Sequence, residues 1–215
     1  MLKNIQIFQQ HLIIFTRYPE PGKTKTRLIP ALGSMGAANL QQQMTEHTML
    51  QVKAVQKATS LSIEVRFAGG SFQLMQDWLG SDLVYQTQGE GDLGARMARS
   101  LADAFQNNAE QAMIIGTDCP GITPEILTTA FQQLQTVDLV LGPAVDGGYY
   151  LIGLRRLLPE LFTNINWGTS QVLQQTVAIA EKLNISHAYL PVLADVDRPE
   201  DLSIWQAVIQ NQAGI

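Results

Sequence analysis

The 215-residue sequence contains one cysteine, Cys119, and only three histidines. A single thiol cannot form an internal disulfide, and the cysteine and histidines form no cluster with the spacing of a zinc site. Long apolar runs are also missing. Residues 11–15 are strand-sized, far short of a membrane span, and no secretory signal pattern precedes them. We therefore expect a soluble cytoplasmic protein without a membrane span.

An excess of basic charge is missing too. The 14 lysines and arginines are outnumbered by 19 aspartates and glutamates, which gives a net charge of −5. A general nucleic-acid binder needs a basic surface for phosphate contacts, so this balance argues against one. A single phosphorylated small molecule held by a local basic loop is still compatible with it. With 46% hydrophobic residues and no repeat or linker, the sequence predicts one domain over residues 1–215.

Strand and helix signals alternate through the chain. Short apolar or alternating runs predict strands at residues 12–15, 62–68, 83–85, 113–115, 138–141, 149–152 and 188–193. Helical spacing and end signals predict helices at about residues 35–57, 72–79, 93–105, 124–134, 171–183 and 198–211. Such alternation is typical of an α/β domain with a mostly parallel sheet.

Asp118 stands where the buried run of residues 113–115 gives way to a loop. Thr123 is placed to cap the helix that follows, with Pro124 at its first position. Open α/β sheets bind ligands at the carboxyl ends of their strands, and a carboxylate there suits a hard cation such as Mg²⁺ or Mn²⁺. The alternative is that Asp118 only accepts backbone N–H bonds in the turn. The residues alone leave both interpretations open.

A basic loop follows the first predicted strand. Residues 16–28 contain two prolines, a glycine and four cations, which are Arg17, Lys23, Lys25 and Arg27. The segment ends like a phosphate-binding P-loop, but that motif requires glycine where Arg17 stands, so we reject it. The loop is a suitable place to bind a diphosphate. A solvated run of surface charge is the alternative.

Two further loops contain glycines and polar groups. Asp92 either caps the helix that follows it or faces a ligand, and Arg96, one turn later, either reaches a phosphate or sugar or forms a surface salt bridge. Asp146, Gly147 and Gly148 form a turn signal between two predicted strands. The turn could serve only to connect the two strands of a hairpin. It would nevertheless bring Asp146 to the same sheet edge as Asp118.

The last third of the chain adds an aromatic side chain and an acidic segment. Trp167 either packs over a bound sugar or shields the core, and we favour shielding. Ser170 is expected to cap a helix. In the closing segment, Asp197 is placed to cap the terminal helix, which would leave Asp195 with spare carboxylate capacity.

The order of these motifs resembles a known family. The motifs are residues 15–17, 21–28, 91–97, 116–120 and 146–153. Together they resemble a bacterial glycosyltransferase-like family, formerly described as a domain of unknown function and linked in some members to arsenosugar biosynthesis. This resemblance implies a single-domain, three-layer α/β/α nucleotide-diphospho-sugar transferase (GT-A) fold with a mostly parallel central sheet. It also implies a nucleotide-sugar substrate and a small-molecule acceptor.

Two neighbouring families share parts of the pattern. Residues 25–28 look like the basic loop of small guanylyltransferases, and residues 195–202 look like the tail of sugar cytidylyltransferases. In the latter, the aspartates matching Asp118 and Asp197 hold Mg²⁺ together. This sequence departs from both families because residues 18–21, Tyr-Pro-Glu-Pro, replace the glycine-rich nucleotidyltransferase signature. A plain Asp-x-Asp motif is also missing, since position 116 is glycine.

These observations lead to a metal-dependent transferase that uses a nucleotide sugar to glycosylate a small molecule. Asp118 and Asp197, or Asp195 in its place, would hold Mg²⁺ or Mn²⁺, and Asp146 is the candidate general base. The predicted substrate-binding residues are Arg17, Lys23, Lys25, Arg27, Asp92, Arg96, Gly147, Gly148 and Trp167. One alternative is a guanylyl- or cytidylyltransferase-like enzyme that joins a nucleoside monophosphate to a phosphorylated small molecule. Another is a non-catalytic nucleotide-sugar binding protein.

Overall fold

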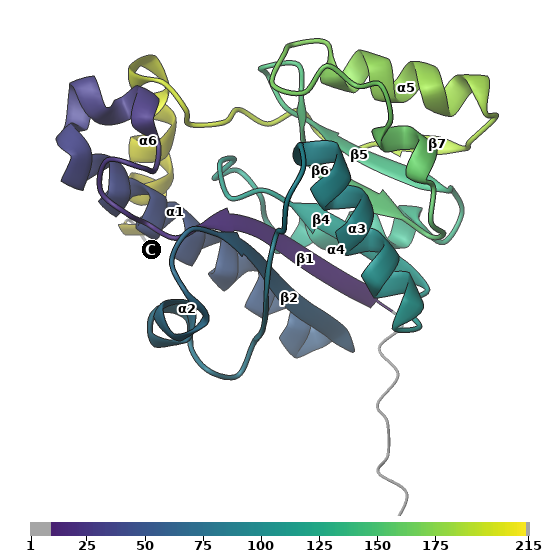
Figure 1. Ribbon diagram of the computed structural model, residues 1–215, viewed down its shortest axis with the longest axis horizontal. Coiled ribbons are helices and arrows are strands. Elements are labelled where there is room, and N and C mark those ends of the chain that lie inside the picture. Colours follow the sequence, from purple (N-terminus) through teal and green to yellow (C-terminus); the bar gives the residue numbers. More distant parts are fainter. Residues whose placement is uncertain (1–9, 214–215) are drawn as a thin grey trace, which may run out of the picture.

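In the computed structural model, which describes residues 10–213, a seven-stranded sheet runs through the middle of the molecule (Figure 1). The strands are β1 (Gln10–Arg17), β2 (Leu61–Ala68), β3 (Val84–Thr87), β4 (Gln111–Ile115), β5 (Leu139–Pro143), β6 (Tyr149–Leu154) and β7 (His187–Tyr189). Their order is β3-β2-β1-β4-β6-β5-β7. Only β6 runs antiparallel to its neighbours within the described sheet. The predicted mostly parallel sheet is therefore confirmed.

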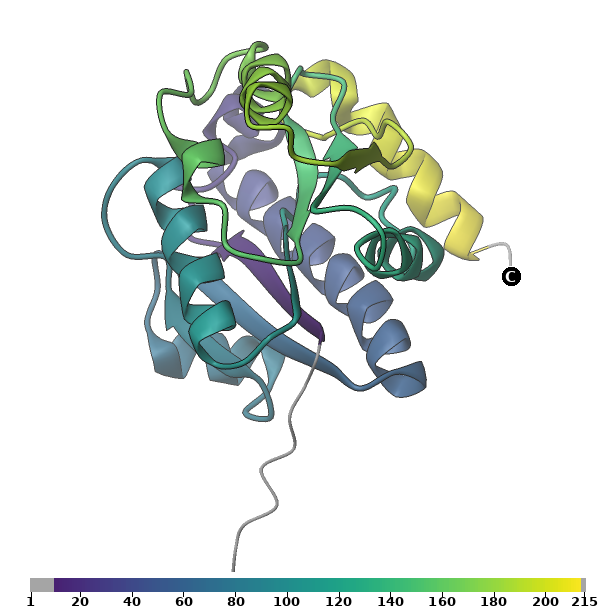
Figure 2. The same cartoon turned by 90° about the vertical axis from the view of Figure 1, so that its right-hand side faces the viewer.

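Helices cover both faces of this sheet. They are α1 (Ile29–Ala58), α2 (Phe72–Leu79), α3 (Leu93–Gln106), α4 (Pro124–Gln133), α5 (Val172–Lys182) and α6 (Leu202–Ala213). The short 3-10 turns η1 (Thr26–Leu28), η2 (Pro159–Phe162) and η3 (Pro199–Asp201) precede α1, α5 and α6. Figure 2 shows α1, α4 and α6 on one side of the sheet and α3 on the other, as a three-layer α/β/α arrangement requires.

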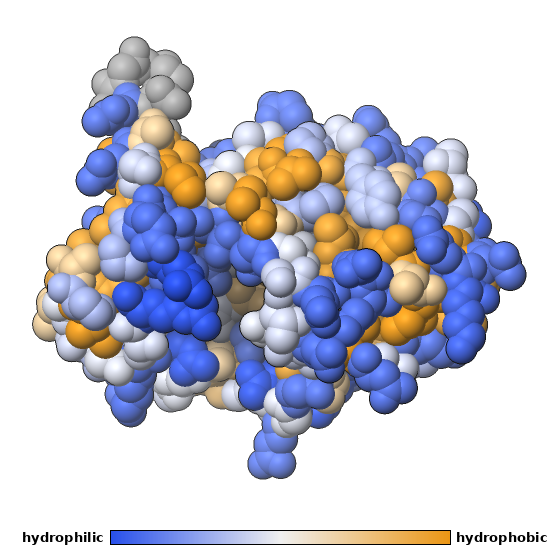
Figure 3. Space-filling view, turned by 90° about the horizontal axis from the view of Figure 1, so that it is seen from above, coloured by the Kyte–Doolittle hydropathy of each residue, from blue (hydrophilic) through white to orange (hydrophobic). Residues whose placement is uncertain are grey.

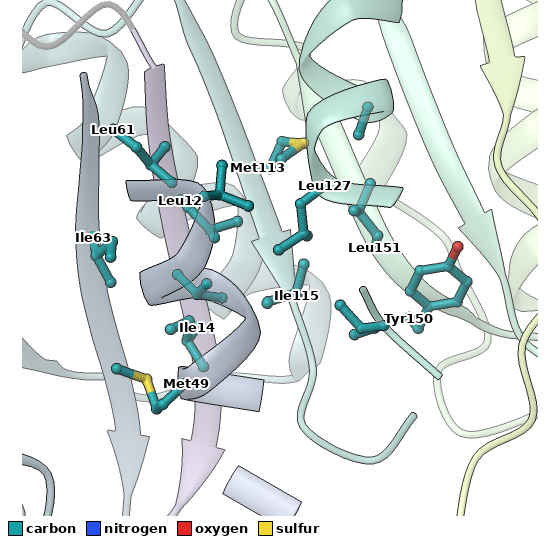
Figure 4. Close-up of a cluster of buried hydrophobic side chains, with 14 of the residues drawn as sticks. Leu12, Ile14, Met49, Leu61, Ile63, Met113, Ile115, Leu127, Tyr150 and Leu151 are labelled. Carbon is teal, nitrogen blue, oxygen red and sulfur yellow. The ribbon is translucent and has the colours of Figure 1, made fainter. Parts of the chain in front are cut away.

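The two faces arise from the period of two along each strand. Leu12 and Ile14 of β1 belong to a core cluster with residues of α1 and α4 (Figure 4). Ile13 and Phe15 belong instead to a second cluster with residues of α3, η2 and α5. Because both faces are covered, β1 is apolar without interruption over residues 12–15.

Local signals predicted most element ends well. The helix expected at residues 72–79 is α2 with the same bounds. The capping interpretations of Asp92 and Thr123 are confirmed, because their side chains accept from the N–H groups of Ala95 and Ile126. The helix expected at residues 35–57 is longer, since α1 begins at Ile29 and continues through a break at Gly33, whose φ is 69°.

Two predicted helix caps are wrong. Gln171, not Ser170, stands at the start of α5, and no side chain caps it. Asp197 does not cap the terminal helical segment either. The carboxylate of Asp201 instead accepts from the N–H groups of Asp197 and Arg198. This leaves the Asp197 side chain available for contacts outside the helix.

The last predicted strand is also corrected. Residues 188–193 were expected to form it, whereas β7 ends at Tyr189. Pro191 has no N–H group to donate to a neighbouring strand, so the ladder stops before it. One isolated parallel bridge, between Ala144 and Leu193, follows. In the part of the chain that the structure describes, no helix has the length and apolarity needed to cross a membrane.

Candidate active site

A cavity of about 500 Å³ opens at the carboxyl ends of the central parallel strands. From β1 the chain continues outward to β2 and β3 on one side of β1, and then returns to place β4 on the other side. The strand order therefore reverses between β1 and β4. Such a reversal creates a crevice in open α/β sheets. The loops after β1, β4 and β7, the turn before β6 and the loop before α5 all contribute to its lining. Figure 3, which looks onto this end of the molecule, shows the surface hollowed beside a strongly hydrophilic block.

The loop after β1 is folded around a buried hydroxyl. Thr24 is 1% exposed, and its Oγ1 lies 3.1 Å from the carbonyl oxygens of Tyr18 and Glu20. The N–H of Glu20 in turn donates to Thr24 Oγ1. Lys25 then adopts a left-handed φ of 45°, which is uncommon for a residue with a side chain. This geometry brings Lys25 and Arg27 to the cavity lining.

Lys25 forms the most enclosed charge contact of the site. Its side chain is 4% exposed, and Nζ lies 2.6 Å from Asp118 Oδ1 and 2.7 Å from the carbonyl oxygen of Val196. An ammonium group removed from water needs such partners. Arg27 pairs similarly with Asp197, but both of these side chains remain more exposed. The basic loop therefore connects the ends of two distant strand segments.

Asp146 lies in the turn between β5 and β6 and lines the same cavity. Its Oδ1 accepts from the N–H of Gly148 at 2.8 Å, which orients the carboxylate. Gly147 has a φ of 89°, and a Cβ there would lie 2.2 Å from the carbonyl oxygen of Ser170. The turn therefore requires glycine at position 147.

The remaining acidic residue of the cavity is Asp195. Burial, the nearby carboxylate of Asp146 and other acidic neighbours raise its pKa above the ordinary value. Burial and the charges of Asp195, Asp118 and Asp146 also raise the pKa of the Cys119 thiol. Cys119 therefore stays a neutral thiol at pH 7, unsuited to act as a nucleophile.

Sequence reasoning missed a polar cluster on the cavity floor. Gln41 of α1 donates toward the hydroxyl oxygens of Thr16, Thr45 and Thr117 at 3.1–3.3 Å, and all four side chains are buried. Gln41, Thr16 and Thr117 line the cavity. Gln41 lies in a polar stretch of an amphipathic helix. From the sequence alone, this single buried glutamine could not be distinguished from its solvent-facing neighbours.

Apolar side chains form another wall of the cavity. They are Leu93 and Met97 of α3, Tyr149, Trp167 and Val172. Trp167 packs edge-on against Tyr149, with ring centroids 6.5 Å apart, and it also packs against the core cluster under α3 and α5. Trp167 therefore packs on the core, as the shielding interpretation expects, and its side chain also lines the cavity.

The structure separates the predicted site residues into two groups. Those that line the cavity are Arg17, Lys25, Arg27, Asp118, Asp146, Gly148, Trp167 and Asp197. Four others lie outside the lining. Exposed Lys23 pairs with Glu20, Asp92 caps α3, Gly147 shapes the turn, and Arg96 donates through Nε to the carbonyl oxygen of Gly91.

A divalent cation at this site would need several oxygen ligands. Within residues 10–213, no group of three or more His, Cys, Asp or Glu side chains forms a ready cation site. Asp118 and Asp197 line one cavity, and each currently contacts a basic side chain. Mg²⁺ is usually held by one or two carboxylates together with substrate phosphates and waters, so these two carboxylates suit a cation that arrives with a phosphate ligand.

Comparisons with solved structures agree on the fold. A candidate nucleotide-diphospho-sugar transferase from Desulfovibrio desulfuricans G20 is 31% identical, with a TM-score of 0.83, and the match covers 88% of this chain and 83% of that one. CMP:2-keto-3-deoxy-manno-octonic acid synthetase in complex with CTP is 11% identical, with a TM-score of 0.58 and coverage of 94% and 99%. The manganese complex of Rv0371c from Mycobacterium tuberculosis H37Rv is 13% identical, with a TM-score of 0.52 and coverage of 94% and 98%. The last two likenesses concern the fold alone.

No curated protein matches the sequence. A bacterial family, described as "Uncharacterized protein conserved in bacteria (DUF2064)", matches residues 51–169, more than half of the chain. With its 31%-identical solved relative, this match shows that the chain belongs to the DUF2064 family and has the nucleotide-diphospho-sugar transferase fold.

Proposed function

We propose that the protein transfers a glycosyl group from a nucleotide sugar to a hydroxyl group of a small molecule, with the help of Mg²⁺ or Mn²⁺. One observation carries this proposal: a carboxylate without an ion-pair partner among the described residues, Asp146, lines the same cavity as the basic side chains Lys25 and Arg27. Phosphate oxygens suit the basic side chains, and an acceptor hydroxyl needs a base. The single cysteine agrees with a cytoplasmic location for this reaction.

Donor binding would proceed by an exchange of partners. Lys25 and Arg27 now contact Asp118 and Asp197, and the non-bridging oxygens of a donor diphosphate would offer them alternative charged partners. Once Lys25 and Arg27 contact the diphosphate, the carboxylates of Asp118 and Asp197 would be free to hold a divalent cation. When bound, that cation would supply positive charge to stabilise the leaving nucleoside diphosphate.

Asp146 would accept the proton of the acceptor hydroxyl. The bond from the hydroxyl oxygen to the anomeric carbon forms while the bond from that carbon to the diphosphate oxygen breaks. The electron pair of the broken bond leaves with the nucleoside diphosphate. The N–H of Gly148 holds the Asp146 carboxylate in one orientation for this step.

Nucleotidyl transfer is the second candidate, because a solved protein of the same fold, though only 11% identical, binds CTP. The loop after β1 argues against it here. Wrapping a triphosphate needs free backbone N–H groups. Pro19 and Pro21 have none, and the N–H groups of Glu20 and Lys23 donate within the loop itself. This loop is better suited to a diphosphate.

Thermal unfolding with a panel of nucleotides, with and without Mn²⁺, tests the proposal, because ligands that bind the folded state raise its stability. Nucleoside diphosphates and nucleotide sugars should stabilise the protein more than the matching triphosphates. Slow release of nucleoside diphosphate from a nucleotide sugar should accompany this, since water can replace the acceptor. Release of pyrophosphate from a triphosphate would instead support nucleotidyl transfer. Binding without any turnover, even with acceptors present, would support the non-catalytic alternative.

A further inference from the structure

The polar cluster on the cavity floor, formed by Gln41, Thr16, Thr45 and Thr117, has no part in the steps described so far. All four side chains are buried, and none of them is charged. Gln41, Thr16 and Thr117 line the cavity, whereas Thr45 is fully buried and does not line it. Buried polar groups in folded proteins are nearly always paired, so any group of this cluster that lacks a partner needs an explanation.

The amide of Gln41 is only half used. Its Nε2 donates toward the three threonine hydroxyls, while its Oε1 accepts no hydrogen bond from the described residues. This oxygen is not sealed inside the protein. Within residues 10–213, the enclosed side-chain polar atoms without a partner belong to Gln133, Tyr149 and Trp167, and Gln41 Oε1 is not among them. Because Gln41 lines the cavity, its Oε1 is an open acceptor on the cavity floor.

The threonine hydroxyls leave a donor unused as well. Each hydroxyl has one hydrogen to donate. Within the cluster, a hydroxyl can accept from another hydroxyl in only two contacts, Thr16 with Thr45 at 2.9 Å and Thr16 with Thr117 at 3.4 Å. Three hydrogens therefore share two contacts, and one is left without an acceptor among the described residues. If the fully buried Thr45 donates to Thr16, the unused hydrogen lies on Thr16 or Thr117, both of which line the cavity.

The unmatched groups indicate the chemistry of the ligand. An open acceptor beside an open donor is matched by one hydroxyl group, which donates to Gln41 Oε1 and accepts from a threonine. If the amide turns by 180°, Oε1 accepts from the threonines and Nε2 faces the cavity as a donor, and a ligand hydroxyl can accept from it. A phosphate oxygen only accepts, so it matches the second orientation alone.

The cluster lies beside the charged end of the cavity. Thr117 directly precedes Asp118, which contacts Lys25, and Thr16 directly precedes Arg17, which also lines the cavity. A hydroxyl bound on the floor must therefore belong to a group close to the phosphates. In a nucleotide sugar, the ribose and the transferred sugar are both attached to the diphosphate, whereas the nucleobase lies one ribose farther away.

We propose that Gln41, with Thr16 or Thr117, binds an uncharged hydroxyl group of the donor, carried by its ribose or by its transferred sugar. The inference rests on the proposed use of a nucleotide sugar. Gln41 is then a specificity-determining residue that contacts the ligand without taking part in bond making. A donor without this hydroxyl leaves the amide and the threonine unpaired on a buried floor, which is how binding sites reject deoxy analogues.

Calorimetric titration with pairs of ligands tests the proposal. UDP, CDP, GDP and ADP are each compared with their 2′-deoxy and 3′-deoxy forms, which report on the ribose. UDP-glucose and GDP-mannose are compared with their deoxy-sugar forms, which report on the transferred sugar. Gln41→Met keeps the length of the side chain but removes the amide. Gln42→Met is the matched control, because Gln42 is exposed and its amide bonds Glu46 instead.

In the wild type, one deoxy probe should bind about 2–10-fold more weakly than its parent, the worth of one neutral hydrogen bond. Gln41→Met should bind the parent more weakly by the same factor and no longer distinguish it from the deoxy form. Gln42→Met should behave like the wild type. Thr45→Val alters the cluster from its buried side and should keep the preference. A preference in the ribose series assigns the floor to the ribose, and one in the sugar series assigns it to the transferred sugar.

Three results would overturn the proposal. One is a wild type that binds every deoxy probe as tightly as its parent, a comparison that does not depend on the folding of any variant. The second is an equal loss of affinity for parent and deoxy probes in Gln41→Met, which would show a purely structural role. The third is a Gln41→Met variant that changes only the choice among nucleobases.

The release of nucleoside diphosphate from UDP-glucose and GDP-mannose is measured separately. Turnover without a hydroxyl preference that depends on Gln41 refutes only the role of the floor. Such a preference without turnover, even with acceptors present, refutes only the transferase function.

Discussion

Two groups of close charge contacts in this molecule have very different surroundings. On β2, the Arg66 side chain is 2% exposed and bonds both Glu64 and Asp103, and Glu64 also bonds His11. At the cavity, Arg27 and Asp197 pair while their side chains are 63% and 35% exposed. In the first group Arg66 and Glu64 are enclosed by protein, with Asp103 at the edge 37% exposed, whereas both members of the second pair are open to water.

The difference shows which charges are structural and which are free to exchange partners. Removing one partner of a buried pair leaves an uncompensated charge in a poorly solvating environment. An exposed pair is screened by water, and its loss changes stability little. Lys25 lies between these cases, because its own side chain is 4% exposed whereas that of its partner Asp118 is 57% exposed. Cavity charges should therefore be separable from the fold, and those of the Arg66 network should not.

The largest effect is expected at Asp146. Asp146→Asn keeps an oxygen that can accept from Gly148 N–H but removes the base. Under the proposed function, transfer from a nucleotide sugar should fall by about 10²–10⁴-fold, the usual contribution of general-base catalysis. The measurement is nucleoside diphosphate release in the presence of acceptor.

The midpoint of thermal unfolding is the control for Asp146→Asn. It should match the wild type, since Asp146 forms no ion pair among the described residues. A variant that unfolds like the wild type and still transfers the sugar at the wild-type rate would exclude Asp146 as the base.

Arg66→Met should instead lower the stability of the fold. It leaves Glu64 and Asp103 without their buried counter-charge, so the free energy of unfolding should fall by about 3–5 kcal/mol. Denaturant unfolding gives this value. The double variant Arg66→Met/Glu64→Gln should recover part of the loss because it removes the uncompensated carboxylate. A single-variant loss below about 1 kcal/mol would place this network with the exposed pairs.

Lys25→Ala and Arg27→Ala test the charges at the cavity. Each should weaken binding of a nucleoside diphosphate by about 1.5–3 kcal/mol, the range for a hydrogen bond to a charged group. Calorimetric titration measures the affinity. Unchanged affinity in both variants would mean that the loop is a run of surface charge.

The same two variants also test the difference between buried and exposed charge contacts, by their effect on the free energy of unfolding. Arg27→Ala should change the free energy of unfolding by no more than about 1 kcal/mol, as for an exposed pair. Lys25→Ala should cost more, because its buried contacts with Asp118 and the Val196 carbonyl are lost. Lys23→Ala is a matched control outside the cavity and should change neither quantity appreciably.

The smallest effect is a pH dependence of the Arg66 network. Burial by itself raises the pKa of the Glu64 carboxyl, but the bond from His11 and the charge and bond of Arg66 outweigh it, so its pKa lies below the ordinary value of 4.5. Ionised Glu64 therefore contributes stability that is present above pH 4.5 and is lost as the pH falls through the lower, folded-state pKa. The stability gap between wild type and Glu64→Gln should narrow over that range in denaturant titrations. A gap that widens on acidification would contradict this assignment.

Much of the fold follows from local sequence. The apolar run at residues 12–15, the caps Asp92 and Thr123, and the bounds of α2 were all predictable, because caps, glycines and side-chain periods act over a few residues. The same local signals place Asp118 and Asp146 in loops directly after strands. They failed for the strand expected at residues 188–193 and for Ser170 as a cap, where weak local preference is decided by packing.

The contacts of the candidate site were decided by tertiary structure alone. Lys25 meets Asp118 across 93 positions and Arg27 meets Asp197 across 170, because β1 pairs with β4 and the segment after β7 returns to the same edge. The sequence selected residue types suited to phosphate and cation chemistry. It could not show which carboxylate each basic side chain contacts, or that the indole N–H of Trp167 lacks a partner among the described residues. Those facts depend on the order and direction of strands, which long-range packing determines and short-range pattern does not encode.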